Sequence, residues 1–174
     1  MTTTRSSQKS ETSQNTRAAR TTNQNAIALL KSDHRTVEDL FEEYEHARKA
    51  ERKQALVQQI CDELTVHAQL EETAFYPAAQ KALGKEGEDL VDEAKVEHNS
   101  LKWLIAQLEE EGPDSALYEA KVTVLKEYVQ HHVKEEEKEM FPKLRKTDLD
   151  LDDLGATLLE TKQQLQQQLQ QKTH

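Results

Sequence analysis

Two segments of the chain place a glutamate four residues after a histidine. His67-x-x-x-Glu71 lies in the first half of the sequence and His132-x-x-x-Glu136 in the second. On an α-helix, residues four apart lie one above the other on the same face. Imidazole nitrogens and carboxylate oxygens are both metal ligands, so two such helices that face each other would supply four ligands to one interior space. The spacing therefore predicts a metal site.

The two segments belong to an internal repeat. Each His-Glu pair is followed by an aromatic residue and a proline, as Phe-Tyr-Pro in the first copy and Met-Phe-Pro in the second. A further histidine precedes each pair: His34 stands 33 residues before His67, and His98 stands 34 residues before His132. The repeat indicates two helical hairpins, each with one histidine on its first helix and the His-Glu pair on its second.

Apolar residues that recur at steps of three and four predict the four helices that position these groups. All six histidines and glutamates of the repeat fall on the apolar stripes. The four stripes are Ile27, Leu30, His34, Val37, Phe41 and Tyr44; Leu56, Ile60, Leu64, His67, Glu71 and Phe75; Val91, Ala94, His98, Leu101, Ile105 and Leu108; and Tyr118, Val122, Leu125, Val129, His132, Glu136 and Met140.

The connections between the predicted helices are short. The chain has only four Gly and three Pro, which favours long helices and few turns. Breaks are expected in the charged segment 48–52, at 83–87 and at 112–115, while Pro77 should kink or end the second helix and Pro142 should close the fourth. Short connections favour antiparallel neighbours, so the predicted fold is an all-α, up-down-up-down four-helix bundle.

A histidine on an apolar stripe is usually a core residue that bonds a neighbour. Four such histidines, one on each helix, together with two glutamates on the same buried faces, favour a different interpretation. A buried carboxylate without a partner costs several kcal/mol, whereas coordination of a metal satisfies all six groups. The pattern therefore favours metal binding over a polar core.

The number and type of ligands indicate two ions. Six nitrogen and oxygen ligands exceed what one tetrahedral zinc ion takes, and they suit two ions bridged by Glu71 and Glu136 with two imidazoles each. Imidazole with carboxylate is also the ligand set of non-haem iron. A ferritin-like site would need Glu-x-x-His on two helices. Only Glu43-x-x-His46 has that spacing, and it falls at a polar helix end, off the stripe.

The combined pattern resembles the hemerythrin-like (HHE cation-binding) domain over about residues 26–145, including the flanking sequences DHRTVEDLFEEYE and HHVKEEEKEMFPKL. This resemblance implies a pair of non-haem irons, oxo- or hydroxo-bridged, inside the bundle. It implies that His34 and His67 serve mainly one iron, that His98 and His132 serve the other, and that two carboxylates bridge them. The implied metal ligands are His34, His67, Glu71, His98, His132 and Glu136.

One position departs from the family pattern. The oxygen-carrying hemerythrins have a fifth histidine one helical turn after the ligand of the third helix, and Lys102 stands there in this chain. One iron would lose a ligand, which leaves an open or water-filled position. An open position favours reaction with dioxygen, peroxide or nitric oxide over reversible carriage.

Other polar residues lie near these six in the sequence. His131 stands four residues before Glu135, but both the repeat and the stripe favour His132 as the ligand. The acidic residues Glu38, Glu72 and Glu137 are expected to be solvated or to orient the ligand histidines. The remaining candidates are assigned to the core, which takes Tyr44, Tyr128 and Cys61, or to the surface, which takes His46 and His174.

The chain divides into a polar tail, the bundle and an extra helix. Residues 1–25 are mostly Thr, Ser, Gln, Asn and Arg and are expected to be disordered, and residues 26–145 form the bundle. In 146–174, Leu154, Leu158, Leu165 and Leu169 mark one Gln-rich amphipathic helix. That helix could pack across the bundle, pair with another subunit in a homo-oligomer, or stay loose.

Composition bounds the function. A net charge of −10 argues against a nucleic-acid partner, and no apolar run approaches the ~18 residues of a membrane span. The single cysteine excludes an internal disulfide and fits a reducing, cytoplasmic location. The expected function is to bind or sense dioxygen, nitric oxide or iron. Alternatives are an enzyme that removes peroxide or nitric oxide, and a metal-supported interaction module that acts through the last helix.

Overall fold

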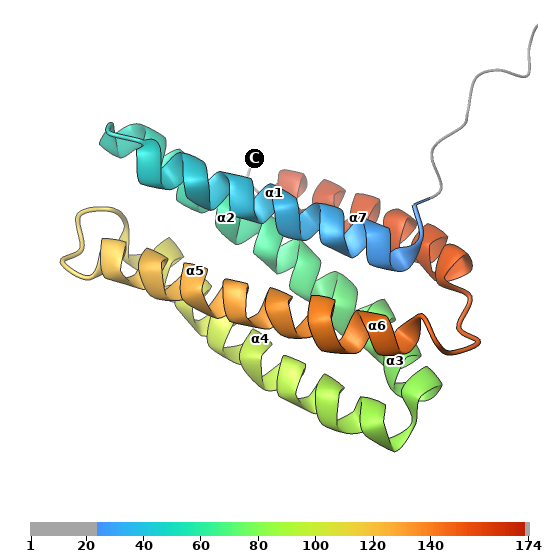
Figure 1. Ribbon diagram of the computed structural model, residues 1–174. Helices are drawn as coiled ribbons and strands as arrows, with labels where there is room; N and C mark the ends of the chain where they lie inside the picture. Colours follow the sequence, from blue (N-terminus) through green and yellow to red (C-terminus); the bar gives the residue numbers. More distant parts are fainter. Residues whose placement is uncertain (1–23, 173–174) are drawn as a thin grey trace, which may run out of the picture.

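The computed structural model describes residues 24–172, and every regular element among them is a helix (Figure 1). Two of the helical runs are continuous rods that change hydrogen-bond pattern along their length. The elements are α1 (Ala26–His46); α2 (Ala50–Leu70), which continues as η1 (Glu71–Phe75) and α3 (Tyr76–Leu83); α4 (Lys85–Glu111); α5 (Tyr118–Glu135), which continues as η2 (Glu136–Met140) and α6 (Phe141–Leu144); and α7 (Leu151–Lys172).

The first four helical runs form an antiparallel bundle. In Figure 1, α1 and α2 make one hairpin, and α4 and α5 make the other. Gly84 alone joins α3 to α4, at a φ of +64° that glycine adopts without a steric cost. The predicted all-α, up-down-up-down bundle with an extra C-terminal helix is confirmed. The predicted disordered tail, residues 1–25, lies outside the described residues except for Gln24 and Asn25, and the three-part domain division stays a prediction.

The second and fourth rods do not end where their prolines were expected to end them. The chain forms a π-helical turn just before each proline, at Glu71–Phe75 and at Glu136–Met140, and then resumes the α-helix. Proline cannot donate a backbone hydrogen bond, and its ring clashes with the carbonyl four residues earlier. The wider turn accommodates the proline without ending the rod, and each π-helical turn begins at a glutamate of the repeat.

The hydrophobic core is divided into two clusters, with the polar groups of the repeat between them. On α1, Leu30 belongs to one cluster and Val37 to the other, and His34 lies between them. On the second rod, Leu64 and Leu70 flank His67 in the same way. The buried histidines and glutamates therefore form a polar layer across the middle of the bundle, enclosed by apolar side chains at both ends.

The Gln-rich helix α7 packs across the bundle against α1 and α2 (Figure 1). It buries Leu158 completely and Leu165 almost completely. Gly155 permits the close approach, because a Cβ there would lie 2.4 Å from the carbonyl oxygen of Gln24. Of the three alternatives for this helix, the structure shows the first, and assembly into a homo-oligomer stays a prediction. Within residues 24–172, no helix has the length and apolar character needed to cross a membrane.

Candidate metal centre

Four of the predicted ligands converge on one side of the polar layer. The ligand atoms of His34, His67, Glu71 and Glu136 all lie within 4.8 Å of one another, and all four residues are buried. His34 Nε2 lies 3.3 Å from Glu136 Oε2, and His67 Nε2 lies 3.2 Å from Glu71 Oε1. Three rods supply this first cluster, because α1, the α2–η1 rod and the α5–η2 rod each contribute to it.

A second cluster lies beside the first. It contains His98 from α4, His132 from α5 and the same Glu71, again within 4.8 Å of one another and buried. The two imidazole Nε2 atoms are 3.1 Å apart, and His98 Nε2 lies 3.2 Å from Glu71 Oε2. The predicted division into His34 with His67 and His98 with His132 therefore corresponds to two adjacent groups of ligand atoms.

Both glutamates reach both histidine pairs. Glu71 directs Oε1 toward His67 and Oε2 toward His98, while Glu136 Oε2 lies 3.3 Å from His34 and 3.7 Å from His132. This is the arrangement that carboxylates adopt when they bridge two ions. The π-helical turns begin at these two residues, and π-helical turns frequently occur at functional sites.

The hydrogen bonds of the first cluster are incomplete. Among the described residues, His34 Nε2, His67 Nε2, Glu71 Oε1 and Glu136 Oε2 are buried side-chain atoms without a hydrogen-bond partner. Buried polar atoms are nearly always bonded, because an unmade bond costs about 1–3 kcal/mol. These four atoms approach one another to about 3.3 Å without hydrogen-bond geometry. Coordination of a shared cation would satisfy them all, so the residues fit a metal.

Each of the four histidines is held at its other nitrogen by a carboxylate. The Nδ1 partners are Glu137 for His34 at 3.0 Å, Asp33 for His67 at 3.5 Å, Glu72 for His98 at 3.0 Å and Glu97 for His132 at 2.7 Å. A carboxylate at Nδ1 fixes the ring orientation and leaves Nε2 free to bind a metal. The sequence left open whether Glu38, Glu72 and Glu137 are solvated or orient histidines. Glu72 and Glu137 each orient one histidine, whereas Glu38 is exposed and pairs with Arg35.

Asp33 and Glu97 were missed from the sequence. Each lies directly before a ligand histidine, as Asp33-His34 and Glu97-His98, but it holds the histidine of the next helix. That repeated acidic residue was the available signal. Neighbours in sequence point in different directions on a helix, so the pairing partner could not be deduced from the repeat alone.

Cations hold three of these four outer carboxylates. Lys162 of α7 lies 2.5 Å from Asp33 Oδ1, and Lys102 lies 2.6 Å from both oxygens of Glu72. Lys31 lies 3.3 Å from Glu137. Lys102, which stands where oxygen-carrying hemerythrins have a fifth histidine, therefore acts on His98 through Glu72.

Tyr76 is the third residue that the sequence did not reveal. Its hydroxyl lies 3.0 Å from Glu136 Oε1 and 3.3 Å from Glu71 Oε2, and it is also within 3.4 Å of the Nε2 atoms of His98 and His132. The helical period places Phe75, four residues after Glu71, on the ligand face. The π-helical turn moves that position to Tyr76, whose N–H donates to the Glu71 carbonyl. Both aromatic residues are fully buried.

The buried histidines, glutamates and Tyr76 change one another's pKa values. Burial alone would lower the pKa of His67, but the Glu71 carboxylate and the Asp33 hydrogen bond outweigh burial and raise it to about 10. Burial would raise the pKa of Glu71, but His67 and the other histidines around it hold that pKa well below its usual range. Burial and the two adjacent carboxylates raise the pKa of Tyr76, so its hydroxyl stays protonated and can donate.

The remaining candidates lie apart from the two clusters. His131 is 61% exposed in its side chain and pairs with Glu97 and Glu135, and His46 is exposed. Tyr44 is buried in the core, as predicted, and so is Cys61. The prediction for Tyr128 is wrong, because that side chain is 48% exposed on the outer face of α5. His174 lies outside the described residues.

Comparison with known proteins gives a consistent result. The family model of the Hemerythrin HHE cation binding domain matches residues 25–144. A protein from Nostoc sp. named DNA nickase is 29% identical over 118 residues, which cover 67% of this chain and 32% of that protein. An uncharacterised hemerythrin-like protein from Schizosaccharomyces pombe is 26% identical over 114 residues, 66% of this chain and 56% of that protein. The chain thus spans about a third and about half of these two curated relatives.

A solved structure shares the architecture. The crystal structure of a hemerythrin HHE cation binding domain-containing protein from Mycobacterium kansasii aligns with a TM-score of 0.68 and 25% sequence identity. The alignment covers 82% of this chain and 87% of that one. The likeness therefore covers most of both chains.

Proposed function

The chain belongs to the hemerythrin family of HHE cation-binding domains, and from this premise we propose that it holds two non-haem irons and uses them to bind or sense a small oxidant such as dioxygen or nitric oxide. His34 and His67 would bind one iron, and His98 and His132 the other. Glu71 and Glu136 would bridge the pair.

One observation carries this proposal: both carboxylates reach both histidine pairs. A single ion would need ligands that converge on one point, whereas Glu71 presents one oxygen to each pair. The donor set is nitrogen and oxygen throughout, without a thiolate, and that set suits non-haem iron. The lone Cys61 belongs to neither cluster.

When bound, iron supplies a redox-active centre with a position where a diatomic ligand can coordinate. The chain's own residues would set the conditions around it. The outer carboxylates hold each imidazole in one orientation, and the two hydrophobic clusters restrict the access of bulk water. Lys102 forms an ion pair with Glu72 and would not bind a metal. The pair His98 and His132 would therefore supply fewer protein ligands than the corresponding site of the oxygen carriers.

A second candidate is a di-iron enzyme that removes peroxide or nitric oxide, and the position of Tyr76 favours it. Its protonated hydroxyl lies among four ligand atoms, where it can donate a proton to an oxygen atom of a bound substrate. The DNA-nicking activity in the name of the Nostoc relative is not proposed for this chain, because the match covers 32% of that protein.

Two measurements on the iron-loaded protein separate the candidates. For a binding protein, we expect the absorption spectrum to change on addition of nitric oxide or dioxygen, with no sustained oxygen evolution from hydrogen peroxide. Rapid oxygen evolution that is lost in Glu136→Ala would instead favour the enzyme. A protein that shows neither a spectral response nor turnover would contradict both candidates.

A further inference from the structure

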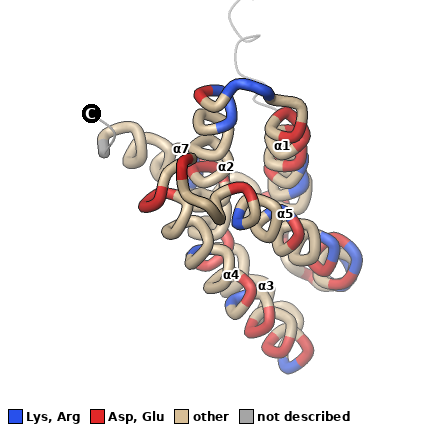
Figure 2. The backbone as a smooth tube through the Cα atoms, turned by 90° about the vertical axis from the view of Figure 1, so that its left-hand side faces the viewer, with Lys and Arg blue, Asp and Glu red and all other residues tan. Residues whose placement is uncertain are grey.

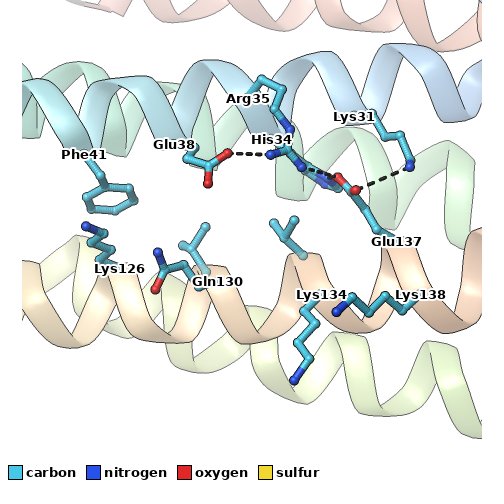
Figure 3. Close-up of a pocket in the computed structure, with 12 residues that line it drawn as sticks. Lys31, His34, Arg35, Glu38, Phe41, Lys126, Gln130, Lys134, Glu137 and Lys138 are labelled. Atoms are coloured by element: carbon cyan, nitrogen blue, oxygen red, sulfur yellow. Dashed lines mark hydrogen bonds and ion pairs between the residues drawn. The ribbon is translucent and has the colours of Figure 1, made fainter.

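A cavity of about 560 Å³ lies between α1 and α5, next to the metal centre (Figure 3). Its apolar part is formed by Phe41 of α1 and by Val129 and Val133 of α5. His34 and Glu137 form the wall that faces the metal centre. We call this space the α1–α5 cavity. Its volume falls within the roughly 300–1,000 Å³ range of small-molecule sites.

The lining of the cavity carries the opposite charge to the chain as a whole. Five cationic side chains against two carboxylates, Glu38 and Glu137, give the lining a net charge of +3 with His34 neutral, whereas the chain has a net charge of −10. Figure 2 shows Lys and Arg on α1 and α5 among the more numerous Asp and Glu. The five cations are Lys31, Arg35, Lys126, Lys134 and Lys138.

Ion pairs within the bundle account for only three of these cations. Lys31 and Arg35 of α1 pair with Glu137 of η2. Lys126 of α5 pairs with Glu45 of α1. Lys134 and Lys138, one turn apart on the α5–η2 rod, have no carboxylate within 4 Å among the described residues. Both side chains are exposed, so they leave positive charge that no carboxylate offsets at the rim of the cavity.

We propose that the α1–α5 cavity binds a small organic anion that joins an apolar body to one carboxylate or phosphate group. The apolar body would lie against Phe41, Val129 and Val133. The anionic group would lie at the rim of the cavity near Lys134 and Lys138, at the end where Glu137 holds His34. Figure 3 shows the Lys134 side chain directed away from α1, so this exposed side chain would turn toward the bound anion. The cavity shares His34 with the first cluster, whereas the residues that would contact the anion belong to neither cluster.

Charge complementarity selects this class of ligand over others. A cation would meet a net positive lining, and a neutral apolar molecule would leave Lys134 and Lys138 as they are. A small inorganic anion would not use the three apolar residues. Only a ligand with both parts uses both features of the cavity, and it gains the burial of its apolar surface as well as the charge contacts.

Calorimetric titration of the protein as isolated tests the proposal with four probes. We expect octanoate and octyl phosphate to bind, whereas acetate, which lacks the apolar body, and octylammonium, which has the opposite charge, should not. Tighter binding of octanoate identifies the carboxylate as the preferred group, and tighter binding of octyl phosphate identifies the phosphate. Binding of octylammonium as tight as that of octanoate, or no binding of either anion, would overturn the proposal.

A double substitution locates the site. Lys134→Gln with Lys138→Gln removes the two cations that have no ion-pair partner, so it breaks no ion pair in the bundle. It should weaken octanoate binding by roughly fivefold. The matched control is Lys81→Gln with Lys85→Gln, two exposed lysines near Gly84 that likewise have no ion pair among the described residues. Equal affinity in the two variants would place the anion elsewhere and refute the α1–α5 cavity as its site.

Discussion

At the scale of single residues, each of the four buried histidines is fixed at Nδ1, and its Nε2 lies among the other members of its cluster. The carboxylates Glu137, Asp33, Glu72 and Glu97 perform this task at distances of 2.7 to 3.5 Å. An imidazole oriented in this way loses little entropy when it binds a metal. These bonds restrict the ring positions, so removal of one of these rings should affect metal binding more than removal of a histidine elsewhere.

The first prediction compares two histidines on neighbouring helices. His67→Ala removes a ligand of the first cluster, so the iron content of the purified protein should fall sharply. His46→Ala removes an exposed ring whose Nδ1 bonds the Glu42 carbonyl oxygen, far from both clusters, and iron content should stay at the wild-type level. Metal analysis of both variants after identical purification is the measurement. Equal iron in the two would refute the ligand assignment.

The second prediction concerns the buried hydroxyl of Tyr76. Tyr76→Phe keeps the ring in the core but removes the hydroxyl group that lies 3.0 Å from Glu136. We expect the iron-loaded variant to fold and to show an altered absorption spectrum, because a group among the ligand atoms has been lost. Tyr44→Phe is the control, since Tyr44 is also buried but lies in the hydrophobic cluster away from the site. Identical spectra for the wild type and Tyr76→Phe would contradict a role for the hydroxyl at the metal.

The sequence predicted the six inner residues because they occupy apolar positions where a charge is costly without a partner. Asp33 and Glu97 could not be selected in the same way. They sit among many acidic residues on polar faces, and only the rotation of the helices shows which histidine each one reaches. Tyr76 depends on a change in helical period, which residue spacing does not reveal.

At the scale of helices, the outer carboxylates link the rods in a closed ring. Asp33 of α1 holds His67 of α2, Glu72 of η1 holds the histidine of α4, and the pattern continues through Glu97 and Glu137 back to α1. Each rod thus supplies a buried histidine and also orients the buried histidine of the next rod. The repeat predicted four rods with inward histidines, but this order follows from packing geometry alone.

The extra helix α7 takes part in this ring through Lys162. Its ammonium group lies 2.5 Å from Asp33. Burial would raise the pKa of the Asp33 carboxyl group, but the hydrogen bonds from His67 and Lys162 outweigh burial and lower that pKa. The sequence left open whether α7 would pack on the bundle. Its leucines show an amphipathic face but not what covers that face, whereas Gly155 allows contact with the start of α1.

The third prediction tests that connection. Lys162→Met keeps most of the aliphatic length but leaves Asp33 without its cation, so His67 is held less firmly. Loss of a carboxylate that bonds a ligand histidine directly lowers metal affinity by roughly tenfold or more. Because Lys162 acts through Asp33, we expect a weakening of up to that size when the metal is removed by a competing chelator. Gln164→Met, which introduces the same residue at an exposed position of the same helix, should leave the affinity unchanged. Equal affinities in the two variants would contradict a link from α7 to the metal.

At the scale of the whole molecule, the polar layer divides the core into two apolar clusters, and each cluster stabilises its own half of the bundle. The half that contains Cys61, Leu64 and Tyr118 carries the lone thiol at 1% exposure. Burial, with smaller contributions from Glu109 and Asp62, raises the pKa of the Cys61 thiol to about 12 from an ordinary value of 9.0. The folded protein therefore retains this proton at a pH where the unfolded chain loses it.

The fourth prediction follows from that difference. The contribution of the neutral thiol to stability is fully present below about pH 9 and is lost as pH rises toward about 12. Above pH 9 the free energy of unfolding should fall by at most about 1.4 kcal/mol per pH unit on account of this group. Urea unfolding at a series of pH values is the measurement. The decline between pH 9 and pH 10 should be shallower in Cys61→Ala, and parallel curves for the two proteins would show that the thiol does not contribute.

The paired metal centre is tested most directly by metal analysis together with the absorption spectrum of the protein as isolated. We expect about two irons per chain and the absorption bands of an oxo-bridged iron pair, because Glu71 and Glu136 each reach both histidine pairs. Stoichiometric zinc without iron would contradict that claim.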